Sequence, residues 1–98
     1  MEITKTKDAG KSTIALSGRL DTTTAPQFEA AVNDVLPGTE ELVFDLKDMS
    51  YTSSAGLRVF LKAQKAMSAQ GEMKLINVQP DVLEIFEITG FVDILNIE

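Results

Sequence analysis

The sequence predicts one α/β domain over residues 1–98, built on a mixed and mostly parallel β-sheet. Ninety-eight residues leave room for a single domain. Short β-prone runs alternate with segments whose apolar residues recur at helical spacing, and two strand-like runs precede this alternation. The predicted order is therefore β-β-α-β-α-β-α-β, in which the first strand pairs antiparallel and the later strands lie parallel.

The first half of the chain predicts a hairpin followed by a helix. Runs of alternating polar and apolar residues lie around Ile3 and over 13-TIALSGRL-20, and 8-DAGK-11 between them has turn chemistry. A helix is expected within 21–36, since its apolar residues are spaced as on one helix face, Thr24 or Ala25 precedes a proline early in the helix, and Pro37-Gly38 follows.

The second half predicts three strands separated by two helices. A buried strand is expected over 41-ELVFDL-46, and a helix begins after Ser54 and ends at Gln70-Gly71. Another strand is expected over 73–78, and a helix opens at Pro80-Asp81.

The C-terminal helix is expected to end at a left-handed cap. Gly90 would supply that conformation, with Phe91 as the apolar residue that packs beside the cap. A last strand is expected over 92-VDILNIE-98.

Composition excludes several functions. The chain has no cysteine, so it has neither disulfides nor thiolate metal sites, and no histidine, the usual general base. We therefore expect that the chain is not an enzyme and that it binds no cofactor. Asp21, Asp45 and Asp48 lie near expected strand ends, but solvated loop carboxylates explain them better than a Mg²⁺ site, so no metal is expected.

Charge and hydropathy also bear on partners. The net charge of −6 argues against nucleic-acid binding. No apolar run approaches the length of a membrane span, and the polar start 1-MEITKTKDAGK-11 is not a signal peptide, so we expect a cytoplasmic protein that does not bind membranes.

The hydroxyl cluster 51-YTSS-54 at the start of the second helix has two explanations. Ser53 or Ser54 is an ordinary helix N-cap, or one of them accepts a phosphate. No acidic residue occurs between Asp48 and Glu72, so no local carboxylate offsets the positive end of the helix dipole. Basic side chains follow at Arg58 and Lys62, and the small pair Ala55-Gly56 is expected to keep the approach to the hydroxyl clear.

Four segments together resemble a known family. They are 17-SGRLDTTTAPQF-28, 45-DLKDMSYTSSAGLRVFL-61, 73-MKLINV-78 and 82-VLEIFEITGFVDIL-95. This pattern is similar to that of STAS domains, specifically the stand-alone anti-sigma factor antagonists, and it covers nearly the whole chain.

The resemblance implies a partner switch. The unmodified protein would bind an anti-sigma factor that is also a serine kinase and so free the sigma factor. That kinase would phosphorylate Ser54 and end the complex, and a separate serine phosphatase would reset the cycle. Members often carry Asp just before the acceptor, where this chain has Ser53, which is therefore a second candidate acceptor.

The same resemblance implies a contact surface around Ser54. Its expected residues are Asp21, Thr22, Thr23, Thr24, Tyr51, Thr52, Ser53, Ser54, Gly56 and Arg58. Cap and phosphate acceptor would then be one hydroxyl, that of Ser54. Two alternatives stay open: a non-signalling STAS subunit of a transporter or stress-sensing complex, and a small module that binds an anion or nucleotide at the helix start.

Overall fold

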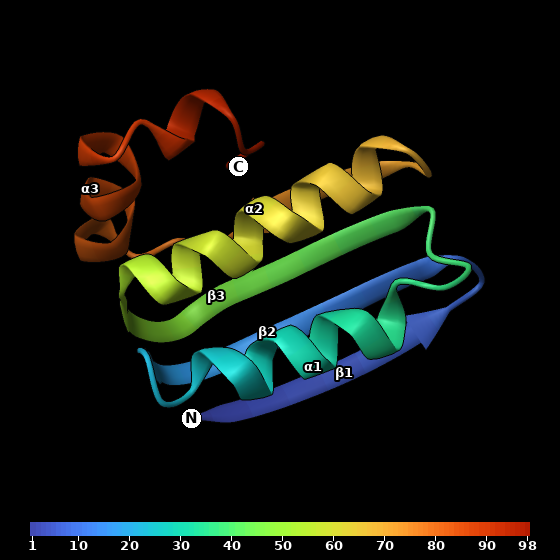
Figure 1. Cartoon of the computed structure of the whole chain (residues 1–98), viewed down its shortest axis with the longest axis horizontal. Coiled ribbons are helices and arrows are strands. Elements are labelled where there is room, and N and C mark those ends of the chain that lie inside the picture. Colours follow the sequence, from blue (N-terminus) through green and yellow to red (C-terminus); the bar gives the residue numbers. More distant parts are fainter.

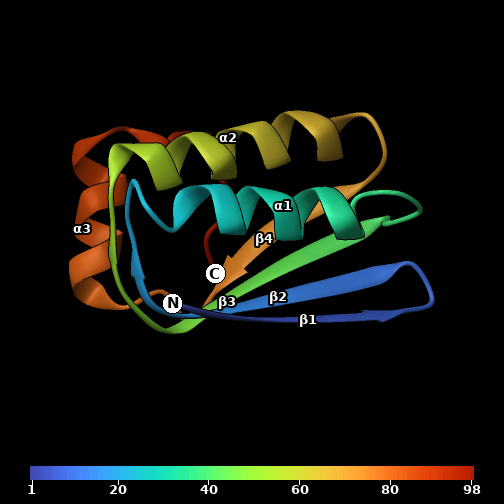
Figure 2. The ribbon, with the colours of Figure 1, turned by 60° about the horizontal axis from the view of Figure 1, so that its bottom comes forward.

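A computed structural model describes all 98 residues as a sheet with the first two helices across one face and the C-terminal helix at one end (Figures 1 and 2). The four strands stand in the order β1-β2-β3-β4. In chain order the elements are β1 (Glu2–Asp8), β2 (Lys11–Leu20), α1 (Ala25–Val35), β3 (Glu41–Thr52), α2 (Ser54–Ser68), β4 (Glu72–Ile76), α3 (Pro80–Ile88) and a 3₁₀ turn η1 (Phe91–Asp93). No helix combines the length and the apolar character needed to cross a membrane.

The pairing of the strands confirms the predicted fold class. β1 and β2 form an antiparallel hairpin that closes at Asp8 and Lys11. The two residues between them, Ala9 and Gly10, have φ of 49° and 87°, as a two-residue hairpin turn that follows the sheet twist requires. β2 pairs parallel with β3, and β3 pairs parallel with β4.

Four phenylalanines pack together between the helices and the sheet. Phe28 of α1, Phe44 of β3 and Phe60 of α2 contact one another edge-on, and Phe86 of α3 joins them through Phe60. Their ring centroids lie 5.0 to 5.8 Å apart, and all four side chains are fully buried. One edge-on aromatic cluster thus connects four elements, in the geometry that aromatic quadrupoles favour.

β3 is longer than the strand expected over 41–46 and continues through Thr52. The added part carries Lys47 and Asp48, which are exposed, before the buried Met49. Two register shifts against β2 accommodate this break in the apolar alternation. The extension brings Thr52 directly to the start of α2.

The helix expected within 21–36 begins at Ala25, just before Pro26, and residues 21–24 form a hydrogen-bonded turn ahead of it. Asp21 accepts backbone hydrogen bonds from the N–H groups of Thr24 and Ala25 at 3.2 and 2.8 Å. The end of β2 and the start of α1 are thereby held in a compact loop.

The last segment does not form the strand expected over 92–98. Gly90 has the expected left-handed conformation, with φ of 80°, and the turn η1 follows it. The turn uses the residues that would begin the strand, so only one parallel bridge remains, between Leu75 and Ile97. Leu75 bonds the backbone on both sides of that bridge, donating to Asn96 O and accepting from Glu98 N at 2.9 and 2.8 Å.

Candidate functional site

The hydroxyl cluster lies where β3 ends and α2 begins. Ser53 is the N-cap residue, with an extended backbone, and Ser54 is the first residue of the helix. Ser53 N–H donates to Leu20 O at 2.8 Å, and Leu57 N–H donates to Ser53 O at 3.0 Å in the first bond of the helix. The backbone of Ser53 therefore ties the start of α2 to the end of β2.

The cap position and the exposed hydroxyl belong to different serines, so the expectation that Ser54 is the helix cap is wrong. Ser54 is exposed and follows the cap residue rather than occupying it. Ser53 occupies the cap position, yet its side chain makes no capping bond. Its Oγ is buried and has no hydrogen-bond partner.

Asp21 organises the neighbouring loop. Its Oδ1 accepts hydrogen bonds from Thr23 N–H at 3.0 Å, Thr23 Oγ1 at 2.7 Å and Thr24 N–H at 3.1 Å. The Thr24 hydroxyl lies 3.2 Å from the same oxygen, accepts from Asp21 N–H at 2.8 Å and has its shortest acceptor contact at Arg19 O, 2.9 Å away. These donors, led by the Thr23 hydroxyl, hold the pKa of the Asp21 carboxyl below its ordinary value. Thr22 stays exposed at the loop surface.

The sheet brings this loop and the start of α2 to the same edge. β2 and β3 are parallel, so their carboxyl ends meet, with Arg19 opposite Tyr51 and Leu20 opposite Thr52. The Arg19 guanidinium lies 4.2 Å from the centre of the Tyr51 ring, a cation–π contact. Ser54, the Asp21 loop and Tyr51 therefore belong to one end of the molecule.

Thr52 and Gly56 lie beneath this surface. Thr52 is 2% exposed, and Gly56 is also buried. A Cβ on Gly56 would lie 2.5 Å from Leu20 Cγ and 2.6 Å from Thr52 Oγ1. The glycine lets α2 approach the sheet closely and does not clear a path to the Ser54 hydroxyl, contrary to expectation.

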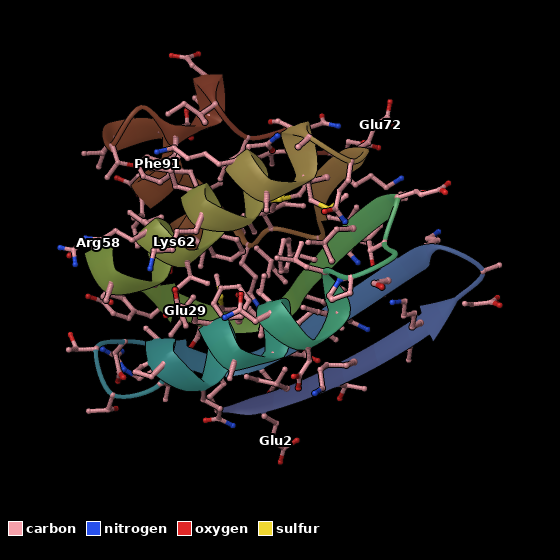
Figure 3. The ribbon with its side chains drawn as sticks, turned by 45° about the vertical axis from the view of Figure 1, so that its right-hand side comes forward. Glu2, Glu29, Arg58, Lys62, Glu72 and Phe91 are labelled. Atoms are coloured by element: carbon pink, nitrogen blue, oxygen red, sulfur yellow. The ribbon has the colours of Figure 1, made fainter.

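A groove lies between the N-terminal halves of α1 and α2, and its lining begins at Ala55, next to Ser54. Its volume is about 200 Å³, and its walls include Thr22, Pro26 and Glu29 on one side and Ala55, Arg58 and Lys62 on the other. Lys62 Nζ pairs with Glu29 Oε2 across it at 2.7 Å, as Figure 3 lets the reader follow. Arg58 is exposed and forms no ion pair, so it presents a free positive charge one turn after Ser54.

Glu29 and Pro26 are two of the wall residues that the sequence analysis does not place at the site. Both belong to α1, and their place in the groove depends on how α1 packs against α2. The helical spacing of α1 marks its buried face but carries no information on that register.

The carboxylates considered for a metal do not come together. No three acidic residues form a group that could hold a metal ion. Asp21 is engaged by its own loop, and Asp45 accepts hydrogen bonds from Lys47 N–H and Asn77 Nδ2, both at 3.1 Å.

Comparison with known proteins gives consistent matches over the whole chain. The family model of the STAS domain matches residues 1–98. A protein of Bordetella bronchiseptica, provisionally named anti-sigma factor antagonist BtrV, is 40% identical over 96 residues, covering 96% of this chain and 83% of its own. The anti-sigma-B factor antagonist of Listeria monocytogenes is 35% identical over 97 residues, covering 96% and 84%.

Solved structures share the fold. An anti-sigma factor antagonist from Mycobacterium paratuberculosis superimposes with a TM-score of 0.89 at 22% identity, covering 98% of this chain and 83% of that one. The anti-sigma factor antagonist SpoIIAA has been solved in its unphosphorylated and phosphorylated forms. Both give a TM-score of 0.77, at 17% and 18% identity, and cover 99% of this chain and 87% and 91% of theirs.

Proposed function

The chain belongs to the STAS domain family, and from that membership we propose that it is an anti-sigma factor antagonist switched off by phosphorylation of Ser54. In its unmodified form it binds an anti-sigma factor with serine kinase activity and thereby frees a sigma factor. A serine phosphatase removes the phosphate and restores binding. This function places the chain in the cytoplasm.

The observation that carries the proposal is the exposed Ser54 hydroxyl at the first position of a 15-residue helix. Helix starts leave N–H groups without partners inside the helix, and the dipole there favours negative charge. The first turn of α2 contains no acidic residue. A phosphate on Ser54 would therefore meet an electrostatically favourable environment.

The phosphoryl group comes from ATP held by the partner kinase. The Ser54 oxygen bonds to the γ-phosphorus as the bond from that phosphorus to the β,γ-bridging oxygen breaks. ADP leaves, and the hydroxyl proton passes to a base of the kinase. This chain has no histidine or cysteine, and its part is to present the hydroxyl.

Phosphorylation acts on the contact surface rather than on the fold. Ser54 is not the N-cap residue of α2, so modifying its hydroxyl breaks no capping bond. It adds a charge of about −1.5 to −2 between the Asp21 loop and the groove. A partner fitted to the neutral surface would meet this charge as repulsion and as a desolvation cost, so its affinity would fall.

The experiment starts with the protein purified from its own cells. Peptide mapping by mass spectrometry over residues 48–58 should find phosphate on Ser54. The protein that co-purifies with Ser54→Ala should include a kinase, and calorimetry with that kinase should show weaker binding by Ser54→Asp than by Ser54→Ala.

Ser53→Ala is the matched control, because it removes the adjacent hydroxyl and leaves Ser54 intact. It should still be phosphorylated. Phosphate found on Ser53 alone would move the switch to that residue. Equal affinity of Ser54→Ala and Ser54→Asp for the kinase would contradict the mechanism.

A further inference from the structure

A second groove lies at α3 and the C-terminal segment 94–98. Its volume is about 560 Å³, within the range of protein binding pockets. Its apolar lining comes from Val78, Leu83, Val92, Leu95 and Ile97. It shares no lining residue with the groove beside Ser54.

The charged side chains of residues 75–98, the part of the chain that forms this groove, are all negative. Residues 75–98 contain no lysine or arginine. Their acidic residues, all exposed and none in an ion pair, are Asp81, Glu84, Glu87, Asp93 and Glu98. Glu87 and Glu98 line the groove itself.

A lysine from outside this segment, Lys74, also lies near the groove. Lys74 lines a small adjacent hollow together with Asn96 and Glu98. Its Nζ is 3.7 Å from Glu41 Oε1, so its charge is already engaged on β3. The groove therefore combines an apolar lining with two unpaired carboxylates, Glu87 and Glu98, which we call the acidic rim.

We propose that this groove binds a segment of a partner protein that presents apolar side chains flanked by lysine or arginine, as one face of a basic amphipathic helix does. Apolar anchors at helical spacing would fill the lining, and the flanking cations would meet the acidic rim. This surface adds a second docking site beyond the proposed switch at Ser54.

The same charges argue against other occupants. A second copy of this chain would bring its own acidic rim against this one, since a symmetric contact pairs identical surfaces. An anionic lipid surface would be repelled for the same reason. A basic protein segment is the occupant that both the apolar lining and the acidic rim favour.

The test uses the ¹⁵N-labelled protein and a synthetic leucine–lysine peptide of about four helical turns, with leucines spaced along one face. Addition of the peptide should shift the amide signals of residues lining the groove. A peptide of the same composition, shuffled so that its leucines share no face, should bind at least about tenfold more weakly, because it keeps the charge and loses the apolar anchors.

A matched pair of double variants tests the rim. Glu87→Lys with Glu98→Lys should weaken peptide binding about tenfold, because each substitution turns an attraction into a repulsion. Glu2→Lys with Asp8→Lys makes the same charge change on exposed residues of β1 and should change binding by less than about threefold. All four positions are exposed, so both variants are expected to fold.

Each other outcome overturns the proposal. Amide shifts confined to the start of α2, equal binding of the shuffled peptide, or equal weakening by both double variants would show that the groove does not select its occupant. Absence of binding at about 1 mM peptide would show the same.

Discussion

Ser53 and Ser54 have opposite exposures although they are neighbours in the sequence. The Ser53 hydroxyl is buried without a partner, and Ser54 faces solvent. A buried hydroxyl that makes no hydrogen bond costs free energy relative to the unfolded chain, where water satisfies it. Substitution of Ser53 should therefore change stability, whereas substitution of Ser54 should change signalling.

Ser53→Ala should raise the free energy of unfolding by about 1 kcal/mol, because it removes an unsatisfied buried hydroxyl. The usual loss of about 1 kcal/mol for an N-cap serine should not appear, because no capping bond is present. Urea denaturation measures the change, with Ser54→Ala as the exposed control. A loss of stability would mean that Ser53 caps α2 in solution.

Asp21 should titrate below the ordinary range of aspartate. The lowered pKa means that its hydrogen bonds stabilise the fold above about pH 3.9, the unfolded value, and that this stabilisation disappears as pH falls through the folded pKa. Thr23→Val removes the largest contributor and should raise the pKa of Asp21. Carboxyl ¹³C shifts measured from neutral pH to about pH 2 follow it.

Thr22→Val is the control for this titration, because Thr22 makes no hydrogen bond to Asp21. It should leave the pKa of Asp21 where it is. An equal rise in both variants would show that the Thr23 hydroxyl is not the cause.

At the scale of elements, the approach of α2 to the sheet depends on Gly56. A side chain there would overlap Leu20 and Thr52, which are both buried. These two residues are the last of β2 and β3, next to the candidate surface. This contact positions the helix start and so the exposure of Ser54. The sequence shows a small residue here, but only the register of α2 on the sheet shows what it contacts.

Gly56→Ala should lower the free energy of unfolding by about 1–2 kcal/mol, because overpacking outweighs the higher helix propensity of alanine. Urea denaturation measures it in the wild-type background and with Leu20→Ala. The substitution should cost less in the second background, where the contacted side chain is removed. Equal costs in both would show that the contact with Leu20 is not the cause.

Elements with regular periodicity are the ones that the sequence predicts well. The helices and the hairpin turn at 8–11 are confirmed because their apolar spacing and turn residues act locally. The extension of β3 through Thr52 is missed because Lys47 and Asp48 interrupt the alternation, and pairing with β2 carries the strand onward. The strand expected over 92–98 is missed because the turn after Gly90 competes with it.

At the scale of the whole molecule, the sequence indicates where the candidate site lies. It does not indicate which of the site's side chains are buried, exposed or paired. The position of Ser54 at a helix start follows from pattern and resemblance. The burial of Ser53 Oγ and the Glu29–Lys62 pair across the groove depend on tertiary packing. The groove at α3 also depends on folding, because its lining residues are brought together by the way α3, η1 and the last residues of one stretch, 78–98, fold against one another.

The contact between Arg19 and Tyr51 has a consequence for how this surface can be observed. The chain has one tyrosine and no tryptophan, so its ultraviolet emission beyond that of phenylalanine comes from a single ring. That ring stands under a guanidinium, three positions before Ser54. The protein therefore contains its own optical reporter: a partner that displaces Arg19, or that brings a tryptophan close, will change the fluorescence of an unlabelled molecule.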